Sequence, residues 1–461
     1  MVLLLLLILC FSCYVFLFSP SLNSVTLFSI LEFLLMIILF HEQKRLMSVS
    51  FLFILFSFLV NCAHPVLILV GYGDKIKNAM MPYFTSMEMY IKAMILVVFV
   101  HFFVFIGCFF FNDCSNNGKQ SISLFDCSIC HSIRQIAIIL LLLSLPFRLY
   151  NDFSKIIVFL ASGYDASLIS VSSGLITSIS KFFDIGVFAL LISFSNEKKK
   201  AVITLIVYSF FVLLVMLTGN RGYGMCCLLA VFLLMFKLYR IKLRFKSLII
   251  MLLLGYIMGS LLITISEYRL SGNYSILFQR LFINIFSGRV FSRFLDEFGT
   301  TLVTTCHSIE SFPNVHQFTY GANYIKSLIL VFPNVLGYVD SVAKSETYSA
   351  YFILKHEIGG SFIGELYYAF GFISPLFSFF IGKLLGKIDK SIDNSIRQGN
   401  ALMLLCSFVF VPALFWWVRD YFWGVVRSVS WSLIVIYLLT TITKKRRILS
   451  NKYSNRINSL I

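Results

Sequence analysis

Residues Lys92–Phe111 read KAMILVVFVHFFVFIGCFFF and are apolar almost throughout. A helix of about 20 apolar residues is long enough to cross the hydrocarbon layer of a bilayer. Inside lipid such a run must be helical, because every backbone N–H and C=O group needs a partner within the chain. The stretch therefore predicts a transmembrane helix.

Similar runs recur along the 461 residues, of which 59% are hydrophobic and 13% are charged. A bilayer can solvate that much apolar surface, whereas a water-soluble core cannot bury it. The first run lacks a basic start and a cleavage site, so we expect it to be retained. The predicted fold class is an all-α polytopic membrane protein with about twelve transmembrane helices: Val2–Phe18, Leu22–Phe40, Leu46–Val70, Lys92–Phe111, Ile133–Tyr150, Leu175–Phe194, Ala201–Thr218, Tyr223–Tyr239, Ser247–Ile265, Ser361–Leu385, Ala401–Val418 and Gly424–Thr443.

One long segment, Ser266–Gly360, is not a simple span. It divides the chain into residues 1–265 with nine spans, the loop 266–360, residues 361–443 with three spans, and a basic tail, 444–461. In the loop, Ile276–Phe298 is apolar with interspersed arginines and predicts a helix at the membrane surface. Ser327–Leu336 is apolar but too short to span. We expect the loop to pack over the helices as a lid or cavity wall.

The net charge of +17 is unevenly distributed. The long loop has seven Lys/Arg and seven Asp/Glu residues and is neutral. Basic residues are enriched in cytoplasmic connections, so the loop is predicted to be periplasmic and both termini cytoplasmic. This distribution argues against a nucleic-acid partner. The basic residues fall in short connections: Lys44-Arg45, Lys198–Lys200, Lys237–Lys246, Lys383–Arg397 and Lys444–Arg447.

Arginine at the predicted outer face needs an explanation other than topology. Guanidinium groups bind phosphate oxygens in a bidentate way, so an anionic lipid diphosphate is a suitable ligand. Arg221, in Thr218-Gly-Asn-Arg-Gly222, lies at the outer end of the seventh span, where membrane-surface snorkelling is the alternative. In the loop, pairing with Glu267, Asp296 or Glu297 is the alternative for the arginines there: Arg269, Arg280, Arg289 and Arg293.

The loop histidines His307, His316 and His356 are candidate general bases near neutral pH, with a structural role as the alternative for each. Metal-ligand spacing such as HExxH is absent from the sequence, and we predict no metal site or cofactor. Cys127-Ser-Ile-Cys-His131 matches a haem-attachment pattern, but it is predicted to be cytoplasmic and has no cytochrome context.

Carboxylates within predicted spans are costly unless they have a partner or a function. Glu365 follows Gly359-Gly-Ser-Phe-Ile-Gly364 in the outer turns of the tenth span, where function and structural pairing are both open. Lys181 and Asp184 in the sixth span are three residues apart and can pair on a helix, as a polar pair facing a cavity. The alternative is a span that starts later, with both residues at its mouth. Glu32, in the second span, is expected to face the bundle interior.

Several short segments together resemble bacterial O-antigen polymerases, the Wzy-type polymerases of oligosaccharide repeat units. The layout of about a dozen spans with one large external loop before the last few is also similar, and the order of the segments carries most of the weight. The segments are Thr218-Gly-Asn-Arg-Gly222, Tyr320-Gly-Ala-Asn-Tyr324, the apolar stretch ending at Pro333, and Gly359-Gly-Ser followed by Gly364-Glu-Leu-Tyr and Phe370-Gly371.

The resemblance implies a class C glycosyltransferase-like bundle in the bacterial inner membrane. Its substrate would be undecaprenyl-diphosphate-linked oligosaccharide at the periplasmic face, and the growing chain would move onto the non-reducing sugar of a new lipid-linked unit. No nucleotide sugar, cofactor or metal is expected. A chain-length regulator is a further expected partner, besides the lipid bilayer.

The resemblance also suggests roles for individual residues. Arg221 matches the family's arginine at that helix end and is expected to bind the diphosphate. Arg269, Arg289 and Arg293 are second choices on charge and location. Glu365 matches the family's Glu-x-Tyr segment, and the base is one of the loop histidines His307, His316 and His356.

Two other functions compete with the polymerase. An O-antigen ligase shares the helices and the loop, and its loop histidine near arginines fits His316 or His307, although the extended Gly-Gly-Ser and Gly-Glu segment favours a polymerase. A non-catalytic flippase of lipid-linked oligosaccharide is expected to have short loops and polar residues throughout its spans. The long outer loop argues against it.

Overall fold

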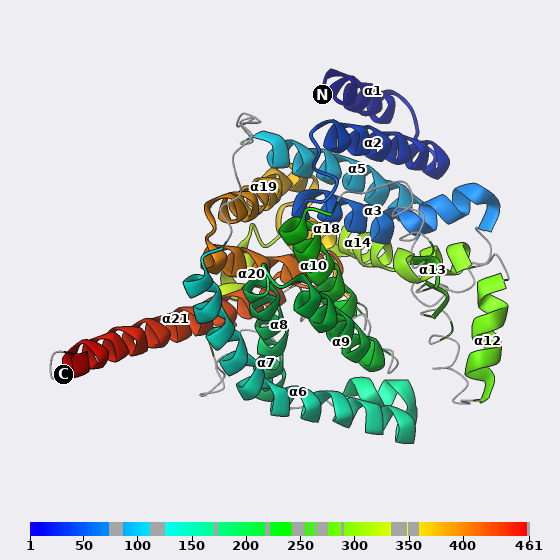
Figure 1. Ribbon diagram of the computed structural model, residues 1–461. Helices are drawn as coiled ribbons and strands as arrows, with labels where there is room; N and C mark the ends of the chain where they lie inside the picture. Colours follow the sequence, from blue (N-terminus) through cyan, green and yellow to red (C-terminus); the bar gives the residue numbers. More distant parts are fainter. Residues whose placement is uncertain are drawn as a thin grey trace. The chain divides into compact units, whose positions relative to one another are not determined.

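The computed structural model describes residues 1–72, 86–110, 125–169, 174–216, 222–241, 253, 255–257, 259–261, 264, 275–286, 290–332, 348 and 359–458. All described elements are helical (Figure 1). Nine described helical segments are long and apolar enough to cross a membrane, and two shorter apolar helices are also present. They agree with the predicted all-α polytopic class. Most of the predicted ninth span, Ser247–Ile265, lies outside the described residues.

The chain divides into two compact units, which are described separately. Unit 1 contains Met1–Asn117, Lys242–Lys390 and Leu414–Val426. Unit 2 contains Gly118–Ile241, Ser391–Ala413 and Arg427–Ile461. Three helices have residues in both units: α19 (Ser374–Gln398), α20 (Ala401–Trp417) and α21 (Phe422–Asn458).

The N-terminal helices form the apolar framework of unit 1. α2 packs against its neighbours, which are α1, α3 and α5. Glu32 of α2 is 1% exposed and faces the interior, as expected. α3 continues into a π-helical turn, η1 (Ile68–Tyr72), in which Gly71 has φ 93°, a value that glycine adopts without strain. The framework helices are α1 (Val2–Leu17), α2 (Leu22–Glu42), α3 (Val49–Leu67) and α5 (Met87–Phe110).

A carboxylate from a distant helix caps the start of α3. Asp389 of α19 accepts hydrogen bonds from the backbone N–H groups of Val49 (2.7 Å) and Ser50 (3.2 Å). It also accepts one from Arg45 NH2 (3.0 Å). The first N–H groups of a helix have no partner within the helix, so this buried carboxylate satisfies them and fixes α19 to α3.

Glycines let α5 and α19 approach closely. A methyl group at Gly107 of α5 would collide with the Phe379 carbonyl oxygen of α19. A methyl group at Gly382 of α19 would collide with the Val104 carbonyl oxygen of α5. Small residues at such contacts allow the backbone-to-backbone packing typical of membrane helices.

The segment 266–360 forms part of the core of unit 1. α13 lies along α3, and α14 lies against α3, α5 and α18 (Phe362–Phe370). Leu302 and Cys306 of α14 are fully buried. Part of the predicted loop is therefore buried among the helices of unit 1, and it does not only cover them as a lid. The location of the loop relative to the membrane stays a prediction. Its described helices are α12 (Ser275–Phe286), α13 (Val290–Gly299), α14 (Thr301–Ser311) and α15 (Ala322–Ile329).

The predicted tenth span is broken near its start. α18 ends at Gly371, where φ is 61° and ψ is −145°, and the short 3₁₀ turn η2 (Gly371–Ile373) leads into α19. Only glycine adopts this backbone conformation readily. The break separates the short helix that carries Glu365 from the long helix that follows.

Unit 2 is built around α6 (Cys127–Ile169) and α8 (Phe182–Ser193), with α9 (Lys198–Met216) and α10 (Gly222–Tyr239) packed nearby. α6 is much longer than the predicted span Ile133–Tyr150. The short helix α7 (Gly174–Ser180) precedes α8, and the two together contain a single candidate membrane span, Ile176–Ser193, which agrees with the predicted sixth span.

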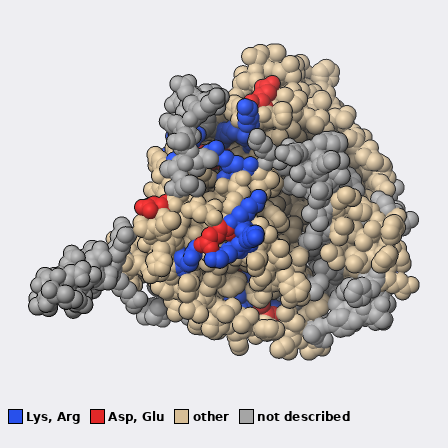
Figure 2. All heavy atoms as spheres, in the orientation of Figure 1, with Lys and Arg blue, Asp and Glu red and all other residues tan. Residues whose placement is uncertain are grey.

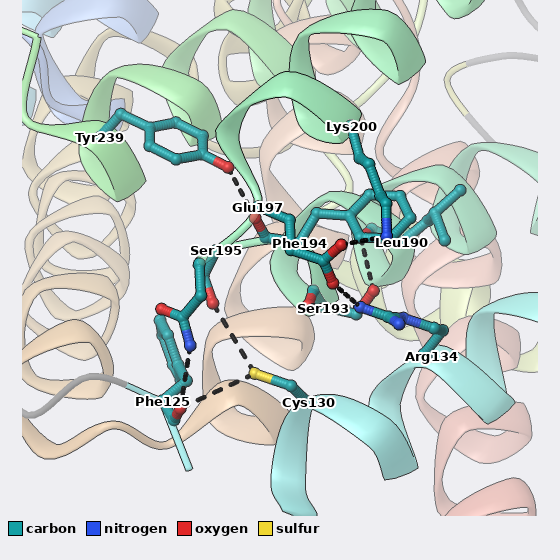
Figure 3. A network of polar contacts seen from close by, with 11 residues as sticks. Phe125, Cys130, Arg134, Leu190, Ser193, Phe194, Ser195, Glu197, Lys200 and Tyr239 are labelled. Carbon is teal, nitrogen blue, oxygen red and sulfur yellow. Dashed lines mark hydrogen bonds and ion pairs between the residues drawn. The ribbon is translucent and has the colours of Figure 1, made fainter. Parts of the chain in front are cut away.

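A polar network ties one end of unit 2 together (Figure 3). Arg134 NH2 lies 2.5 Å from Glu197 Oε1, and Lys200 pairs with the same carboxylate. Hydrogen bonds from Lys200 and then from Arg134 lower the pKa of Glu197. Tyr239 donates a hydrogen bond to the Phe194 carbonyl oxygen (2.8 Å). The network thus joins α6, the α8–α9 connection and the end of α10.

The surface of the helices is largely uncharged. In the view of Figure 2, Lys, Arg, Asp and Glu side chains occupy a few patches among uncharged residues. On α9 the side chains of Ile203, Ile206, Val207 and Phe210 are each more than 60% exposed. Lipid is the solvent that suits such a surface, which is consistent with a multi-pass membrane protein.

Candidate functional site

Glu365 is the centre of a junction in unit 1 between α18 and the turn that joins α20 to α21. Its side chain is buried, and its Oε2 atom accepts two hydrogen bonds. One comes from Trp417 Nε1 (2.9 Å) and the other from the Phe422 backbone N–H (3.0 Å). The carboxylate thus fixes the start of α18 to this turn. We call this region the Glu365 junction; it comprises α14, the segment 312–321, α15, α18 and residues 417–422.

Packing requires glycine at the second position of the Gly359-Gly360 pair that precedes α18. A Cβ atom at Gly360 would lie 2.6 Å from the carbonyl carbon and oxygen of Asp420. At Gly359 the nearest atom to such a Cβ would be the Arg419 carbonyl oxygen, at 3.7 Å, an ordinary contact. The close approach of two backbones therefore explains Gly360 and leaves Gly359 with room for a methyl group.

Substituting Gly360→Ala should consequently destabilise the protein by about 1–3 kcal/mol, because an overpacked methyl group displaces the Asp420 backbone. The neighbouring substitution, Gly359→Ala, is the matched control and should leave stability close to wild type. The thermal unfolding midpoint of each purified variant measures the difference. Equal midpoints for the two variants would contradict the close approach at Gly360.

Hydroxyl groups of α14 hold the same glycine segment. Thr304 Oγ1 donates to the Gly359 carbonyl oxygen (2.9 Å). Thr305 Oγ1 lies 3.0 Å from Ser361 Oγ. Ser361 in turn caps α18, because its side chain accepts a hydrogen bond from the Gly364 N–H. The α14 helix from the predicted loop is thereby a structural support of the Glu365 helix.

The Tyr320–Tyr324 segment lies at the other end of α18. The backbone N–H groups of Thr319 and Tyr320 donate to the carbonyl oxygens of Tyr368 (3.3 Å) and Ala369 (2.9 Å). Tyr320 has φ 49°, an uncommon value for a residue other than glycine, and its side chain is 78% exposed. Two of the segments that carried the family resemblance therefore meet in space.

Aromatic side chains enclose the junction. The Tyr324 ring stacks on Phe370 with 6.3 Å between centroids, and its edge meets Phe422 at 5.1 Å. The Tyr324 hydroxyl is buried and makes no hydrogen bond to any residue that the structure describes. Burial and then the nearby Glu365 charge raise the pKa of Tyr324. The phenol consequently stays protonated at neutral pH and is available as a donor.

The predicted histidines differ in accessibility. His316 is exposed on the segment after α14, and its ring lies 5.6 Å from the Phe312 ring. His307 is half-buried on α14, and its Nδ1 lies 3.4 Å from Glu310 Oε2. His356 lies outside the described residues. His316 therefore lies in the segment whose Thr319 and Tyr320 contact the end of α18, and His307 lies on the supporting helix α14.

Comparison with known proteins gives one match. A family model described as O-antigen polysaccharide polymerase Wzy matches residues 1–452. The chain belongs to this family. Membership supports a role in O-antigen polymerisation, and the apolar helices make the Wzy-family chain a multi-pass membrane protein. Neither a curated protein nor a solved structure matches the chain significantly.

The predicted diphosphate-binding arginines of this Wzy-family chain are only partly described. Arg293 is exposed on α13, as is Arg280 on α12. Arg221, Arg269 and Arg289 lie outside the described residues.

The α13 helix is docked through a histidine that the sequence did not single out. His64 of α3 is buried, and its Nε2 lies 3.0 Å from the Asp296 carbonyl oxygen and 3.1 Å from Asp296 Oδ1. Gly299 allows the close approach, since a methyl group there would collide with the His64 ring. Asp296, an alternative partner for the loop arginines, thus binds His64. The sequence signal that could have pointed to this contact was a histidine near the end of a predicted span.

A second polar cluster of the Wzy-family chain lies in unit 2. Arg148 Nε lies 2.5 Å from Asp152 Oδ2, and Arg148 NH1 lies 3.2 Å from Asp184 Oδ2. The sequence offered Lys181 as a possible partner of Asp184, and the structure shows a pairing of Asp184 with Arg148. Sequence reasoning missed Arg148, although its spacing of four residues from Asp152 in an apolar context was a usable signal.

Metal-ligating groups do not cluster in the described part of the chain: no three His, Cys, Asp or Glu side chains there are close enough to hold an ion. The Cys127–His131 segment is the first turn of α6, and Cys130 is buried with its Sγ 3.7 Å from Ser195 Oγ (Figure 3). This helix packing gives Cys130 a structural explanation.

Proposed function

We propose that the chain polymerises undecaprenyl-diphosphate-linked oligosaccharide units at the periplasmic face of the inner membrane. In this reaction a hydroxyl group of one unit attacks the anomeric carbon of the growing chain, and the C–O bond to the lipid diphosphate breaks. The hydroxyl proton passes to a base, and the diphosphate leaves with the bonding electrons. The family match over residues 1–452 supports this assignment.

The distribution of charge supports the orientation. In unit 2, Lys200 belongs to the Arg134 network and begins helix α9 together with Lys198 and Lys199, and Lys237 near the end of α10 pairs with Asp393. In unit 1, Arg45 and Asp389 lie at the start of α3. The helix that carries Asp389, α19, also carries several lysines. Because basic ends are normally cytoplasmic, we place the opposite ends, including the Glu365 junction, at the periplasmic side.

His316 is our choice for the proton acceptor. Histidine is a common general base, and the exposed ring of His316 is accessible to a substrate hydroxyl group. The exposed ring of Tyr320, four residues later, offers a flat apolar face for a sugar. The observation that carries the proposal is that hydrogen bonds from Thr319 and Tyr320 pin this segment to the end of the Glu365 helix.

Glu365 has a positioning role in this proposal, because its buried carboxylate is engaged with Trp417 and Phe422. Preorganised supports of this kind keep reacting groups in place. His307 and His356 are the alternative bases. Arg221, Arg269, Arg289 and Arg293 are proposed to stabilise the leaving diphosphate, since charge-assisted hydrogen bonds to phosphate are strong.

Gene deletion with complementation tests the function. We expect the deletion strain to keep lipopolysaccharide with a single repeat unit and to lose the longer bands of the ladder. Removal of a general base slows a reaction about 10²–10⁴-fold, so His316→Ala should not restore the ladder. The control variant, His131→Ala, changes an exposed histidine on α6 and should restore it.

The outcomes separate the steps. Loss of the single-repeat band in the deletion strain would assign the chain to ligation or flipping and end the polymerase proposal. A full ladder from His316→Ala, at wild-type protein level, would leave the polymerase in place and move the base to another residue.

A further inference from the structure

Helix α15, which follows Tyr320 and Gly321 in unit 1, buries polar side chains. Asn323 and Ser327, one turn apart, are 1% and 3% exposed. Both have hydrogen-bond partners in their own segment, since Thr319 Oγ1 donates to Asn323 Oδ1 (2.8 Å) and Ser327 Oγ donates to the Asn323 carbonyl oxygen (2.8 Å). A surface helix in water turns its apolar side to the core, so this helix has the opposite polarity.

The exposed side of α15 is apolar. Ile325 is 67% exposed, Leu328 is 55% exposed and Ile329 is 37% exposed. Phe332, in the turn after the helix, is 59% exposed. Spacings of three and four residues place these side chains on one side of the helix, opposite the buried polar pair. Lys326, the one charged residue of α15, is half-buried. We call the four exposed apolar side chains the α15 stripe.

Phe370 connects α15 to the start of α19. Its ring stacks on Tyr324 of α15, with 6.3 Å between centroids, and on Phe377 of α19, with 3.7 Å. The apolar side chains of Ile373 in η2 and Phe380 in α19 are 62% and 60% exposed. Both belong to the candidate membrane span that contains α18 and α19. The α15 stripe therefore adjoins a helix whose exposed apolar surface suits lipid.

The length of α15 decides how it can meet a bilayer. Its eight residues form about 12 Å of helix, less than half of the roughly 30 Å hydrocarbon layer. It also adjoins the beginning of α19, as the Phe370 contacts show. A helix with one apolar side that is too short to span lies in the plane of the membrane surface, with its apolar side against the acyl chains.

We propose that α15 lies in the bilayer surface and that the α15 stripe contacts the acyl chains of membrane lipids. This contact holds the preceding segment, with His316 and Tyr320, at the level of the lipid head groups. The bond between a sugar and a lipid diphosphate lies at the same level, so α15 brings the candidate base within reach of it. This consequence rests on the proposed polymerase function, whereas the lipid contact itself does not.

Photocrosslinking to lipid tests the contact. The full-length protein, with the photoreactive residue benzoylphenylalanine in place of Leu328, is reconstituted in phosphatidylcholine nanodiscs and irradiated. We expect mass spectrometry to find phosphatidylcholine adducts, as at Phe380 of α19, the positive control. Gln398 is exposed at the other end of α19, about 27 Å from Phe380 along the helix, and should give far fewer adducts.

The molecule that is crosslinked decides the outcome. Lipid adducts at Phe380 without any at Leu328 would overturn the proposal. Adducts at Leu328 to a second copy of the chain or to another protein would make the α15 stripe a protein interface and would also overturn it. Adducts that form only after undecaprenyl diphosphate is added would assign the stripe to the tail of the substrate, and the bilayer contact would be wrong.

A charge on the α15 stripe tests the consequence for the reaction. Leu328→Asp places a carboxylate against the acyl chains, so it should lose the longer bands of the ladder in the complemented deletion strain. Because Leu328 is exposed, the thermal unfolding midpoint in detergent should stay at the wild-type value. The matched control, Asn400→Asp, adds the same charge in an exposed turn, keeps the oxygen that caps α20, and should restore a full ladder.

The two tests can fail separately. Lipid adducts at Leu328 together with a full ladder from Leu328→Asp would keep α15 in the membrane surface and overturn its role in placing the reaction. If the deletion strain contradicts the polymerase while the adducts still form, the lipid contact stands and the reaction is wrong. If Leu328→Asp lowers the unfolding midpoint, Ile325→Asp, at the most exposed position of the α15 stripe, takes its place in the ladder test.

Discussion

Replacing Arg148 with methionine should lower the free energy of unfolding by about 3–5 kcal/mol, because Asp152 and Asp184 are then left buried without their cation. The loss should appear as a lower thermal unfolding midpoint of the purified protein. Methionine retains much of the side-chain volume, so the effect reports the missing charge rather than a cavity. An unchanged midpoint would mean that the two carboxylates are not held by Arg148.

A neutral triple variant separates the cost of unpaired carboxylates from the contribution of the whole ion network. Arg148→Met/Asp152→Asn/Asp184→Asn removes all three charges while keeping similar volumes. Replacing a buried ion network with neutral groups is often close to neutral for stability, so most of the midpoint should return. A midpoint as low as that of Arg148→Met would contradict this explanation.

Replacing Glu365 with alanine should have the second large effect. The Trp417 and Phe422 N–H groups would lose their acceptor, and a buried unsatisfied donor costs about 1–3 kcal/mol. The turn between α20 and α21 would then be less firmly held against α18. We expect a lower unfolding midpoint and loss of the longer bands of the lipopolysaccharide ladder in the complemented deletion strain.

The isosteric substitution Glu365→Gln is the control. Its amide oxygen can still accept both hydrogen bonds, so stability and the ladder should remain close to wild type. If Glu365→Gln instead abolishes the ladder at a wild-type midpoint, the negative charge takes part in the reaction and the positioning role is wrong.

The sequence was informative about elements with strong local signals. The length of the apolar runs predicted the helices, because a backbone in lipid must form its hydrogen bonds within the chain. It was less informative where charges pair over long distances. Spacing alone offered Lys181 as a possible partner of Asp184, but it gave no sign of the contact with Arg148, thirty-six positions earlier. Spacing reports neighbours on one helix, whereas this contact depends on how α6 and α8 pack.

The candidate site shows the same difference between local sequence signals and contacts that depend on packing. Residues of the Tyr320–Tyr324 and Gly359–Gly371 segments were recognisable as motifs, but their contact depends on the backbone bonds from Thr319 and Tyr320 to the end of α18. The requirement for glycine at 360 rather than 359 comes from the Asp420 backbone, which belongs to another helix connection. Sequence order cannot report such an approach.

By itself the sequence determined the all-helical membrane class, the resemblance that the family match confirms, and the residues from which a site can be built. The tertiary structure decided which of these residues share an environment: Glu365 with Trp417 and Phe422, His64 with Asp296, and Arg148 with Asp184. The physical reason is that apolar periodicity and length are local properties of the chain. The partner of a buried polar group is chosen by helix packing, because a low-dielectric interior requires each such group to find a partner wherever the fold brings one.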